Sequence, residues 1–108
     1  MLIITLLFRC GVHISQNTSV PLVFGLNVMV KDSNGEVIGN DSQYVFPLNG
    51  FGLPSELPYK VVVTPGLKET DPIVLEYAGF STPTVAPACS VGGYDNGVRQ
   101  MDCGFPCS

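Results

Sequence analysis

Four cysteines carry the most distinctive chemistry in this sequence of 108 residues, and they stand at Cys10, Cys89, Cys103 and Cys107. Structural zinc sites usually pair their cysteines as C-x2-C, and redox catalysis uses the same close spacing. The last three cysteines here are spaced C-x13-C-x3-C, and Cys10 lies far upstream. An even number of cysteines in a short chain instead predicts two disulfides. We therefore expect no metal site and no cofactor.

A turn signal predicts how the cysteines pair. Asp95-Asn96-Gly97 lies between Cys89 and Cys103, and Asn and Gly tolerate the positive φ that hairpin turns require. If the hairpin loop consists of these three residues, Cys89 faces Cys103 across the two strands, within reach of a disulfide. Cys10 is then left to pair with Cys107, which would tie the first strand to the tail. In the chain-entropy description each bridge stabilises the fold by on the order of 3–4 kcal/mol, and the bridge that closes the long loop contributes more than the one that closes the short loop.

The predicted disulfides indicate an extracellular protein, because such bonds persist in oxidising compartments. Two glycosylation sequons, Asn17-Thr18-Ser19 and Asn40-Asp41-Ser42, agree with a secretory route. The longest apolar run, residues 2–8, is far shorter than the roughly 20 residues that span a bilayer. It also lacks the basic start and the cleavage site of a signal peptide. We interpret it as a buried first strand, and we expect that a secretion signal has been removed and that no membrane span is present.

His13 and nine carboxylates are the remaining candidates for catalysis. Nucleophilic catalysis would need His13 beside a nucleophile and an orienting acid, whereas the neighbouring Cys10 is expected to be oxidised. Glycoside hydrolysis needs two carboxylates that face one cleft. The carboxylates lie mostly beside turn signals, as Asp32 and Asp95 do near Asn-Gly steps and Asp71 does before a proline. We expect no enzymatic activity, and a small secreted hydrolase remains the second alternative.

The segment from Asp32 to Glu36 alternates carboxylate and amide oxygens, as a calcium loop does. The spacing of an EF-hand is absent, however, because that loop has glycine at its sixth position and glutamate at its twelfth. Asn34-Gly35 is a strong hairpin signal. The sequence therefore predicts a hairpin turn here.

Charge excludes one class of partner. The formal net charge is −4, and the five basic residues are isolated from one another. A nucleic-acid-binding surface needs a cluster of Lys and Arg that neutralises several phosphates. We therefore expect no nucleic-acid partner, and the same lack of a basic cluster disfavours an anionic membrane surface.

The distribution of apolar residues predicts an all-β fold. Hydrophobic residues make up 45% and charged residues 13% of the chain, which excludes disorder. Apolar runs separated by Gly and Pro predict strands at residues 20–30, 36–38, 44–46, 60–64 and 73–78, before the hairpin that carries Cys89 and Cys103. No run has helical periodicity. We expect a single β domain over residues 1–108, a small antiparallel β-sandwich with a small β-barrel as the alternative. The continuous apolar runs at 61–63 and 73–75 indicate central strands.

Between these strands, residues 49–59 read as a loop with several apolar side chains, Phe51, Leu53, Leu57 and Tyr59. Loops usually run over the surface. These side chains therefore either cover the core or form an exposed patch for a partner. The second interpretation makes them a candidate partner-binding loop.

The tail from Cys89 to Cys107, with its C-x13-C-x3-C spacing and its Gly-Gly-Tyr-Asp-Asn-Gly turn, resembles small secreted fungal proteins of the effector or elicitor kind. The resemblance is confined to this segment. It implies secretion, no enzymatic activity and recognition at a host or cell-wall surface. It implies no particular binding residues.

Taken together, these features predict a secreted, non-enzymatic binding protein, a fungal effector or elicitor recognised by or acting on host tissue. The first alternative is a small lectin-like module that binds carbohydrate or cell wall. Such modules need aromatic stacking platforms, and in the absence of tryptophan four tyrosines are available, Tyr44, Tyr59, Tyr77 and Tyr94. The expected partner is thus a protein or a cell-wall glycan.

Overall fold

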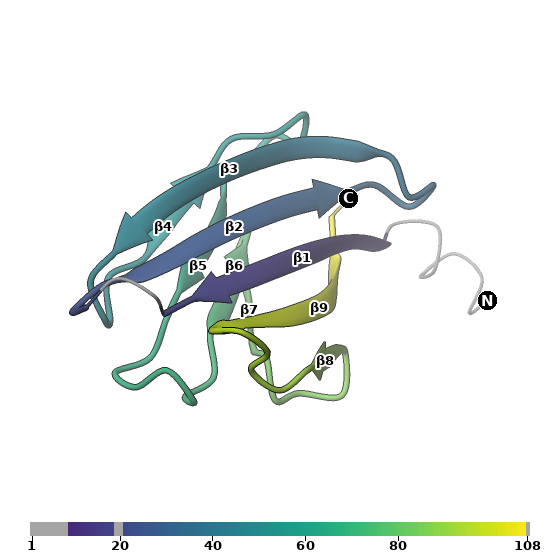
Figure 1. Ribbon diagram of the computed structural model, residues 1–108. Helices are drawn as coiled ribbons and strands as arrows, with labels where there is room; N and C mark the ends of the chain where they lie inside the picture. Colours follow the sequence, from purple (N-terminus) through teal and green to yellow (C-terminus); the bar gives the residue numbers. More distant parts are fainter. Residues whose placement is uncertain (1–8, 19–20, 108) are drawn as a thin grey trace.

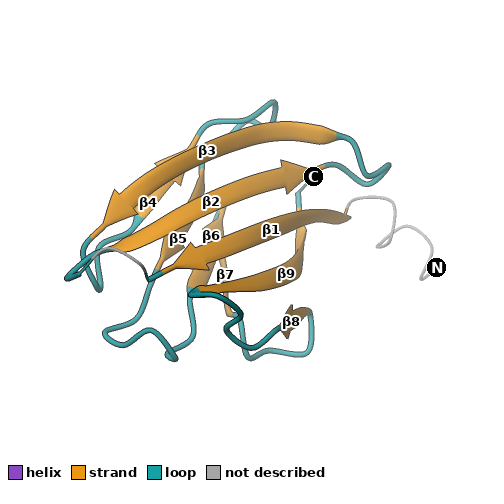
Figure 2. Cartoon of the chain, viewed as in Figure 1, coloured by secondary structure: helices purple, strands orange, loops and turns teal. Residues whose placement is uncertain are grey.

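The computed structural model describes residues 9–18 and 21–107, which form two antiparallel β-sheets and no helix (Figures 1 and 2). The strands are β1 (Arg9–Asn17), β2 (Phe24–Lys31), β3 (Val37–Val45), β4 (Phe51–Leu53), β5 (Val61–Thr64), β6 (Val74–Tyr77), β7 (Phe80–Pro83), β8 (Cys89–Val91) and β9 (Val98–Pro106). One sheet has the order β3-β2-β1-β9-β8 and the other β4-β5-β6-β7. The prediction of a sandwich is confirmed, since the sheets stay separate throughout the described residues and no barrel closes.

The first described strand, β1, is one that the sequence did not predict. The strand predicted at residues 2–8 lies outside the described residues, and β1 begins at Arg9. Along β1 the side chains alternate strictly, so that Val12 and Ile14 are buried while His13 and Ser15 are partly exposed. This period of two is what a strand with one buried face requires. β1 lies between β2 and β9 at the centre of its sheet.

β3 is longer than predicted, because Gly39-Asn40-Asp41 continues the strand through the gap between the strands predicted at 36–38 and 44–46. Gly39 is needed there for a close contact. A Cβ at this position would lie 2.6 Å from Cβ of Ser55 and 3.1 Å from the carbonyl oxygen of Pro54. The segment after β4 therefore crosses directly over β3, and Glu56 N donates a hydrogen bond to Ile38 O at 3.0 Å. Residues 44–46, predicted as a separate strand, include the end of β3.

The second sheet contains two strands that the sequence did not predict. β4 lies inside the expected loop, and β7 follows β6 through a tight turn at Ala78-Gly79. Both turn residues have positive φ, 49° for Ala78 and 86° for Gly79, which is the type I′ pattern. β5 and β6 are the central strands of this sheet, as their apolar runs predicted.

The core lies between the two sheets. Its largest fully buried side chains include Ile14, Leu26 and Phe105 on one side and Leu53 and Leu75 on the other. Phe105 meets Tyr77 across the layers at a ring-centroid distance of 5.3 Å. Burial of apolar surface of this kind contributes roughly 25 cal/mol per Å², so the packed interior supplies the main stabilising free energy.

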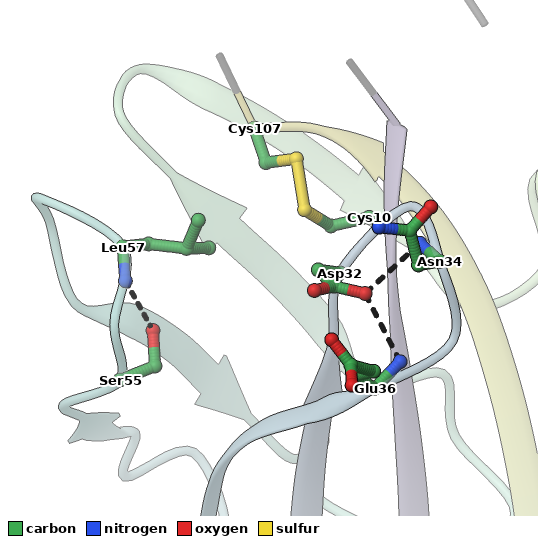
Figure 3. Close-up of a disulfide and its surroundings, with 7 residues drawn as sticks. All are labelled: Cys10, Asp32, Asn34, Glu36, Ser55, Leu57 and Cys107. Carbon is green, nitrogen blue, oxygen red and sulfur yellow. Dashed lines mark hydrogen bonds between the residues drawn. A yellow bond between two sulfur atoms is a disulfide. The ribbon is translucent and has the colours of Figure 1, made fainter. Parts of the chain in front are cut away.

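Both disulfides join the predicted partners. Cys89 faces Cys103 in the β8–β9 register, and Cys10 bonds to Cys107 (Figure 3). The turn itself differs from the expected three residues. It is closed by an Asp95–Val98 bridge around Asn96-Gly97, so the loop has two residues. The β8–β9 register shifts by one residue across the intervening Gly92, Gly93 and Tyr94. This shift brings Cys89 opposite Cys103.

Candidate functional site

The outer face of the five-stranded sheet carries short polar side chains in cross-strand rows. One row runs from Gln100 through Ser15 and Asn27 to Ser42, one residue from each of four neighbouring strands. These positions face outward because their neighbours along each strand fill the core. The sheet thus presents hydroxyl and amide groups to solvent over β9, β1, β2 and β3.

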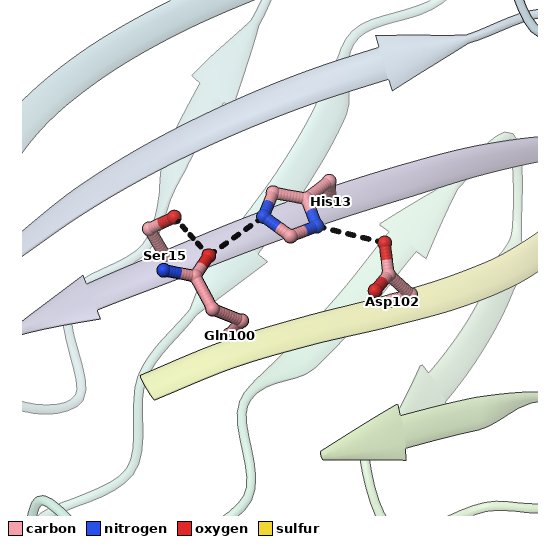
Figure 4. A network of polar contacts seen from close by, with 4 residues as sticks. All are labelled: His13, Ser15, Gln100 and Asp102. Atoms are coloured by element: carbon pink, nitrogen blue, oxygen red, sulfur yellow. Dashed lines mark hydrogen bonds and ion pairs between the residues drawn. The ribbon is translucent and has the colours of Figure 1, made fainter. Parts of the chain in front are cut away.

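His13 lies in a polar network at one side of this face (Figure 4). Its Nδ1 is 2.8 Å from Oδ1 of Asp102, and its Nε2 is 2.7 Å from Oε1 of Gln100. Ser15 Oγ donates to the same oxygen of Gln100 at 2.6 Å. The side chain of Asp102 is 63% exposed, so an ion pair with His13 contributes little to stability.

Ser15, His13 and Asp102 are the residue types of a hydrolytic triad, but their hydrogen bonds differ from those of a triad. In a triad the serine hydroxyl hydrogen-bonds to the imidazole, which removes its proton. Here Gln100 stands between Ser15 and His13 and engages both. The arrangement therefore orders the side chains on the sheet surface and leaves Ser15 without a base.

A shallow hollow of about 260 Å³ opens beside the network, on the outer face of β1, β2 and β3. Gly25 is among the residues that line it, and a Cβ at Gly25 would come within 3.1 Å of the ring of Tyr44. The ring of Tyr44 therefore lies against the glycine of the neighbouring strand, its directly opposed residue. Tyr44 is nevertheless 67% exposed, so most of its surface is open to solvent.

The lining of this hollow is uncharged. Besides Gly25 and Tyr44 it contains Ser15, Asn17, Leu26, Asn27, Ser42, Gln43 and Val98. Asn27 Nδ2 donates to Ser42 Oγ, so these two groups are held in place. Hydroxyl and amide groups can each donate and accept hydrogen bonds. The hollow can therefore bind a neutral ligand rich in hydroxyl groups, and its exposed aromatic ring can pack against an apolar face of that ligand.

A smaller hollow of about 180 Å³ lies on the outer face of the second sheet, beside the turn at Ala78-Gly79. Among the residues that line the two hollows, Glu76 is the one carboxylate, and it lies in the smaller hollow. Neither hollow thus brings together the two carboxylates that glycoside hydrolysis needs.

The candidate partner-binding loop packs mostly against the core. Leu53 is 1% exposed, and Phe51 and Leu57 are partly buried against the core cluster. Of the four predicted residues Tyr59 alone projects from the surface, with 62% exposure, and it touches Tyr77 edge-on. For Phe51, Leu53 and Leu57 the first interpretation of this segment therefore holds, since they cover the core, the first two from β4 and Leu57 from the segment that follows it.

The segment from Asp32 to Glu36 forms the predicted hairpin turn (Figure 3). Asp32 Oδ1 accepts hydrogen bonds from the backbone N–H of Asn34 at 2.9 Å and of Glu36 at 3.0 Å. Its carboxylate is therefore used to hold the turn. Among the described residues, no group of three or more His, Cys, Asp and Glu side chains is placed to hold a metal ion.

Arg99 is buried at the end of the sandwich where the turn of Asn96-Gly97 lies. Its Nε donates to Gln16 Oε1 at 2.8 Å, its Nη2 donates to the carbonyl oxygen of Asp71, and its guanidinium lies over the ring of Tyr94. Tyr94 in turn donates from its hydroxyl to Glu69 O at 2.7 Å. Burial raises the pKa of Tyr94, and the charge of Arg99 opposes that shift. These contacts fasten the segment between β5 and β6 to β9.

Comparison of the chain with protein-family models, curated proteins and solved structures found no match. The described residues form no helix that is long and apolar enough to cross a membrane. The fold and the polar face therefore provide the basis for a functional interpretation.

Sequence reasoning named Tyr44 as a possible stacking platform but did not identify the polar residues around it. The missed signal was the alternation of polar and apolar residues from Val12 to Ser15, which marks one exposed strand face. The partners on β2 and β3 could not be found in this way, because their positions depend on strand register.

Proposed function

We propose that this protein is a secreted, non-enzymatic binding protein whose ligand is a neutral cell-wall polysaccharide. The observation that carries the proposal is the exposed ring of Tyr44 beside a hollow lined by uncharged hydroxyl and amide groups. Sugar rings combine an apolar C–H face with hydroxyl groups at their edges. The C–H face can pack against an aromatic ring, and the hydroxyl groups can form hydrogen bonds with Asn and Ser side chains.

Two features of the molecule support this choice over a protein partner. The hollow is shallow and uncharged, so it offers neither charge complementarity nor the deep apolar pocket that anchors a protein hot spot. Its polar groups lie in rows across antiparallel neighbouring strands of one sheet, which suits an extended chain of repeating sugar units. The tail predicts an effector or elicitor role. In the proposal, the protein would perform this role by binding polysaccharide at a cell-wall surface.

Titration of the ¹⁵N-labelled protein with neutral oligosaccharides from chitin, β-glucan and xylan tests the ligand class. We expect one of them to shift the backbone amides of Asn27, Ser42 and Tyr44. Replacement of Tyr44 by Ala should weaken binding by about tenfold or more, which corresponds to roughly 1.4 kcal/mol. Tyr59→Ala is the matched control, because Tyr59 is similarly exposed but lies away from the hollow.

The proposal fails if none of these oligosaccharides shifts any amide of the folded protein, or if the shifts map elsewhere. It also fails if Tyr44→Ala and Tyr59→Ala lose affinity equally. Infiltration of the purified protein into leaf tissue tests the elicitor role separately. A leaf response to the native protein but not to Tyr44→Ala would show that elicitor activity depends on polysaccharide binding. If the native protein gives no response, the elicitor role is rejected.

A further inference from the structure

Four exposed apolar side chains gather at one end of the sandwich, Leu22, Phe46, Leu48 and Leu67, and they are called the apolar tip below. Their exposures are 86%, 60%, 62% and 60%. Phe24 pairs with Val45, so the chain just before β2 and just after β3 lies at the same end of the sheet (Figure 1). Leu48 N donates to the carbonyl oxygen of Pro65 at 3.2 Å, which brings the turn before Leu67 to this end as well.

Two members of the tip are held in a conformation that leucine rarely adopts. Leu22 has φ of 71° and Leu48 has φ of 69°. Each follows a proline, and Asn49 N donates to Phe46 O at 3.0 Å, which closes a turn of type II over Pro47 and Leu48. That turn normally has Gly or Asn where Leu48 stands. Backbone strain of this kind at a bulky residue concentrates at sites of function.

Charge around the tip favours one kind of partner. Residues 21–30, 42–55 and 61–67, which supply the tip and its supports, contain no charged side chain. The nearest charged residues along the chain beyond Leu67 are Lys68, Glu69 and Asp71, which together are net negative. Leu22 and Leu48 each stand in a turn and Leu67 in a bend, so the apolar side chains project from three separate loops. A rigid protein would have to match several separate projections, whereas a lipid interface deforms around them.

We propose that the apolar tip inserts into the interface of a zwitterionic phospholipid bilayer. Apolar side chains at turn apices would enter the boundary between headgroups and acyl chains, as the apolar face of an interfacial helix does. Lys68 beside Leu67 is outweighed by Glu69 and Asp71, so the charge next to the tip is net negative and anionic lipids are the poorer target. The strained leucines present apolar side chains to solvent at positions where Gly or Asn would relieve the backbone.

The test is cosedimentation of the full chain with phosphatidylcholine vesicles, and with vesicles that also contain phosphatidylserine. The variant is the double substitution Leu22→Asn with Leu48→Asn, since Asn accepts positive φ and is polar. We expect it to raise the melting temperature and to lower partitioning into phosphatidylcholine vesicles at least about tenfold. Val37→Asn is the control, because Val37 is 51% exposed at the opposite end of β3. It should bind vesicles as the native protein does.

Three results would overturn the proposal. The first is no binding of the native protein to phosphatidylcholine vesicles, and the second is unchanged binding of the double variant. The third is stronger binding when phosphatidylserine is included, which would contradict the charge distribution. The main alternative is that the apolar tip binds a second copy of the chain. Light scattering after size exclusion tests this alternative by measuring the oligomeric state. A dimer that the double variant abolishes, without vesicle binding, would assign the tip to self-association.

Discussion

Cys89 and Cys103 lie directly opposite each other on β8 and β9, with their Cα atoms 4.0 Å apart. Their disulfide closes a short loop of 14 residues in sequence separation, whereas Cys10–Cys107 spans 97 residues. The two bridges therefore constrain the unfolded chain to different extents. The longer one also ties the start of β1 to the end of β9, at the centre of the larger sheet.

Removal of the long-range disulfide should destabilise the protein more than removal of the short-range one. In the chain-entropy description the pair Cys10→Ala and Cys107→Ala costs about 4–5 kcal/mol, and the pair Cys89→Ala and Cys103→Ala costs about 3 kcal/mol. Urea denaturation at one pH measures both. A larger loss for the short-range pair would show that effects in the folded state outweigh the entropy of the unfolded chain.

Substitutions in the two tight turns should change the free energy of unfolding in opposite directions. Ala78 and Asn96 both have positive φ at the first position of a two-residue turn. Alanine is strained there and asparagine is not, so Ala78→Asn should raise the free energy of unfolding by about 0.5–1 kcal/mol, and Asn96→Ala should lower it similarly. Thermal and urea denaturation measure both variants. A loss of stability in both cases would contradict this explanation.

Tyr94 should make stability decrease at alkaline pH. Burial raises the pKa of Tyr94 above 10.0, so the folded state keeps its hydroxyl proton after the unfolded state has lost it. The folded state then binds more protons, and linkage lowers the free energy of unfolding as pH rises through 10 toward the raised value. The contribution is fully present below pH 10. Urea denaturation at pH 8 and near pH 11 should show a smaller decrease for Tyr94→Phe than for the native protein, with Tyr59→Phe as control.

Gly39 should tolerate no side chain. A Cβ there would lie 2.6 Å from Cβ of Ser55, and both the strand and the crossing segment would have to move. Gly39→Ala should cost about 1–3 kcal/mol, as overpacking does. Gly11→Ala is the matched control in β1, where the nearest atom is the carbonyl oxygen of Cys103 at 3.8 Å. Equal urea midpoints for the two variants would show that the crossing segment is not held against β3.

Much of the fold could be predicted because its signals are local. The Asn-Gly steps at Asn34-Gly35 and Asn96-Gly97 mark two hairpin turns, and the apolar runs at 61–63 and 73–75 mark the two central strands of the smaller sheet. The sequence was ambiguous where a residue type is compatible with two different local structures. Gly39 suited both a turn and a close contact within a strand, and the apolar residues 51–57 suited both a surface patch and a cover for the core.

The candidate site was less predictable than the fold. Tyr44 was a candidate only as one of four tyrosines, and nothing in the sequence distinguished it from Tyr77, which is 4% exposed in the core. The difference arises because Tyr44 faces outward over Gly25 on the neighbouring strand, while Tyr77 faces inward against Phe105. Each relationship joins residues that are far apart in the chain.

The sequence by itself determined the class of fold and the positions of the two Asn-Gly turns, and it predicted the correct cysteine partners although the turn between Cys89 and Cys103 is one residue shorter than expected. These follow from preferences of neighbouring residues for φ and from alternate burial along a strand, which act over only a few positions. The tertiary structure alone decided which polar side chains share the outer face, that Gln100 separates Ser15 from His13, and that Leu22 and Leu48 lie at the same end of the sandwich. Those outcomes depend on strand register and on how the sheets pack, and a shift of one residue in register would reverse which side chains face the solvent.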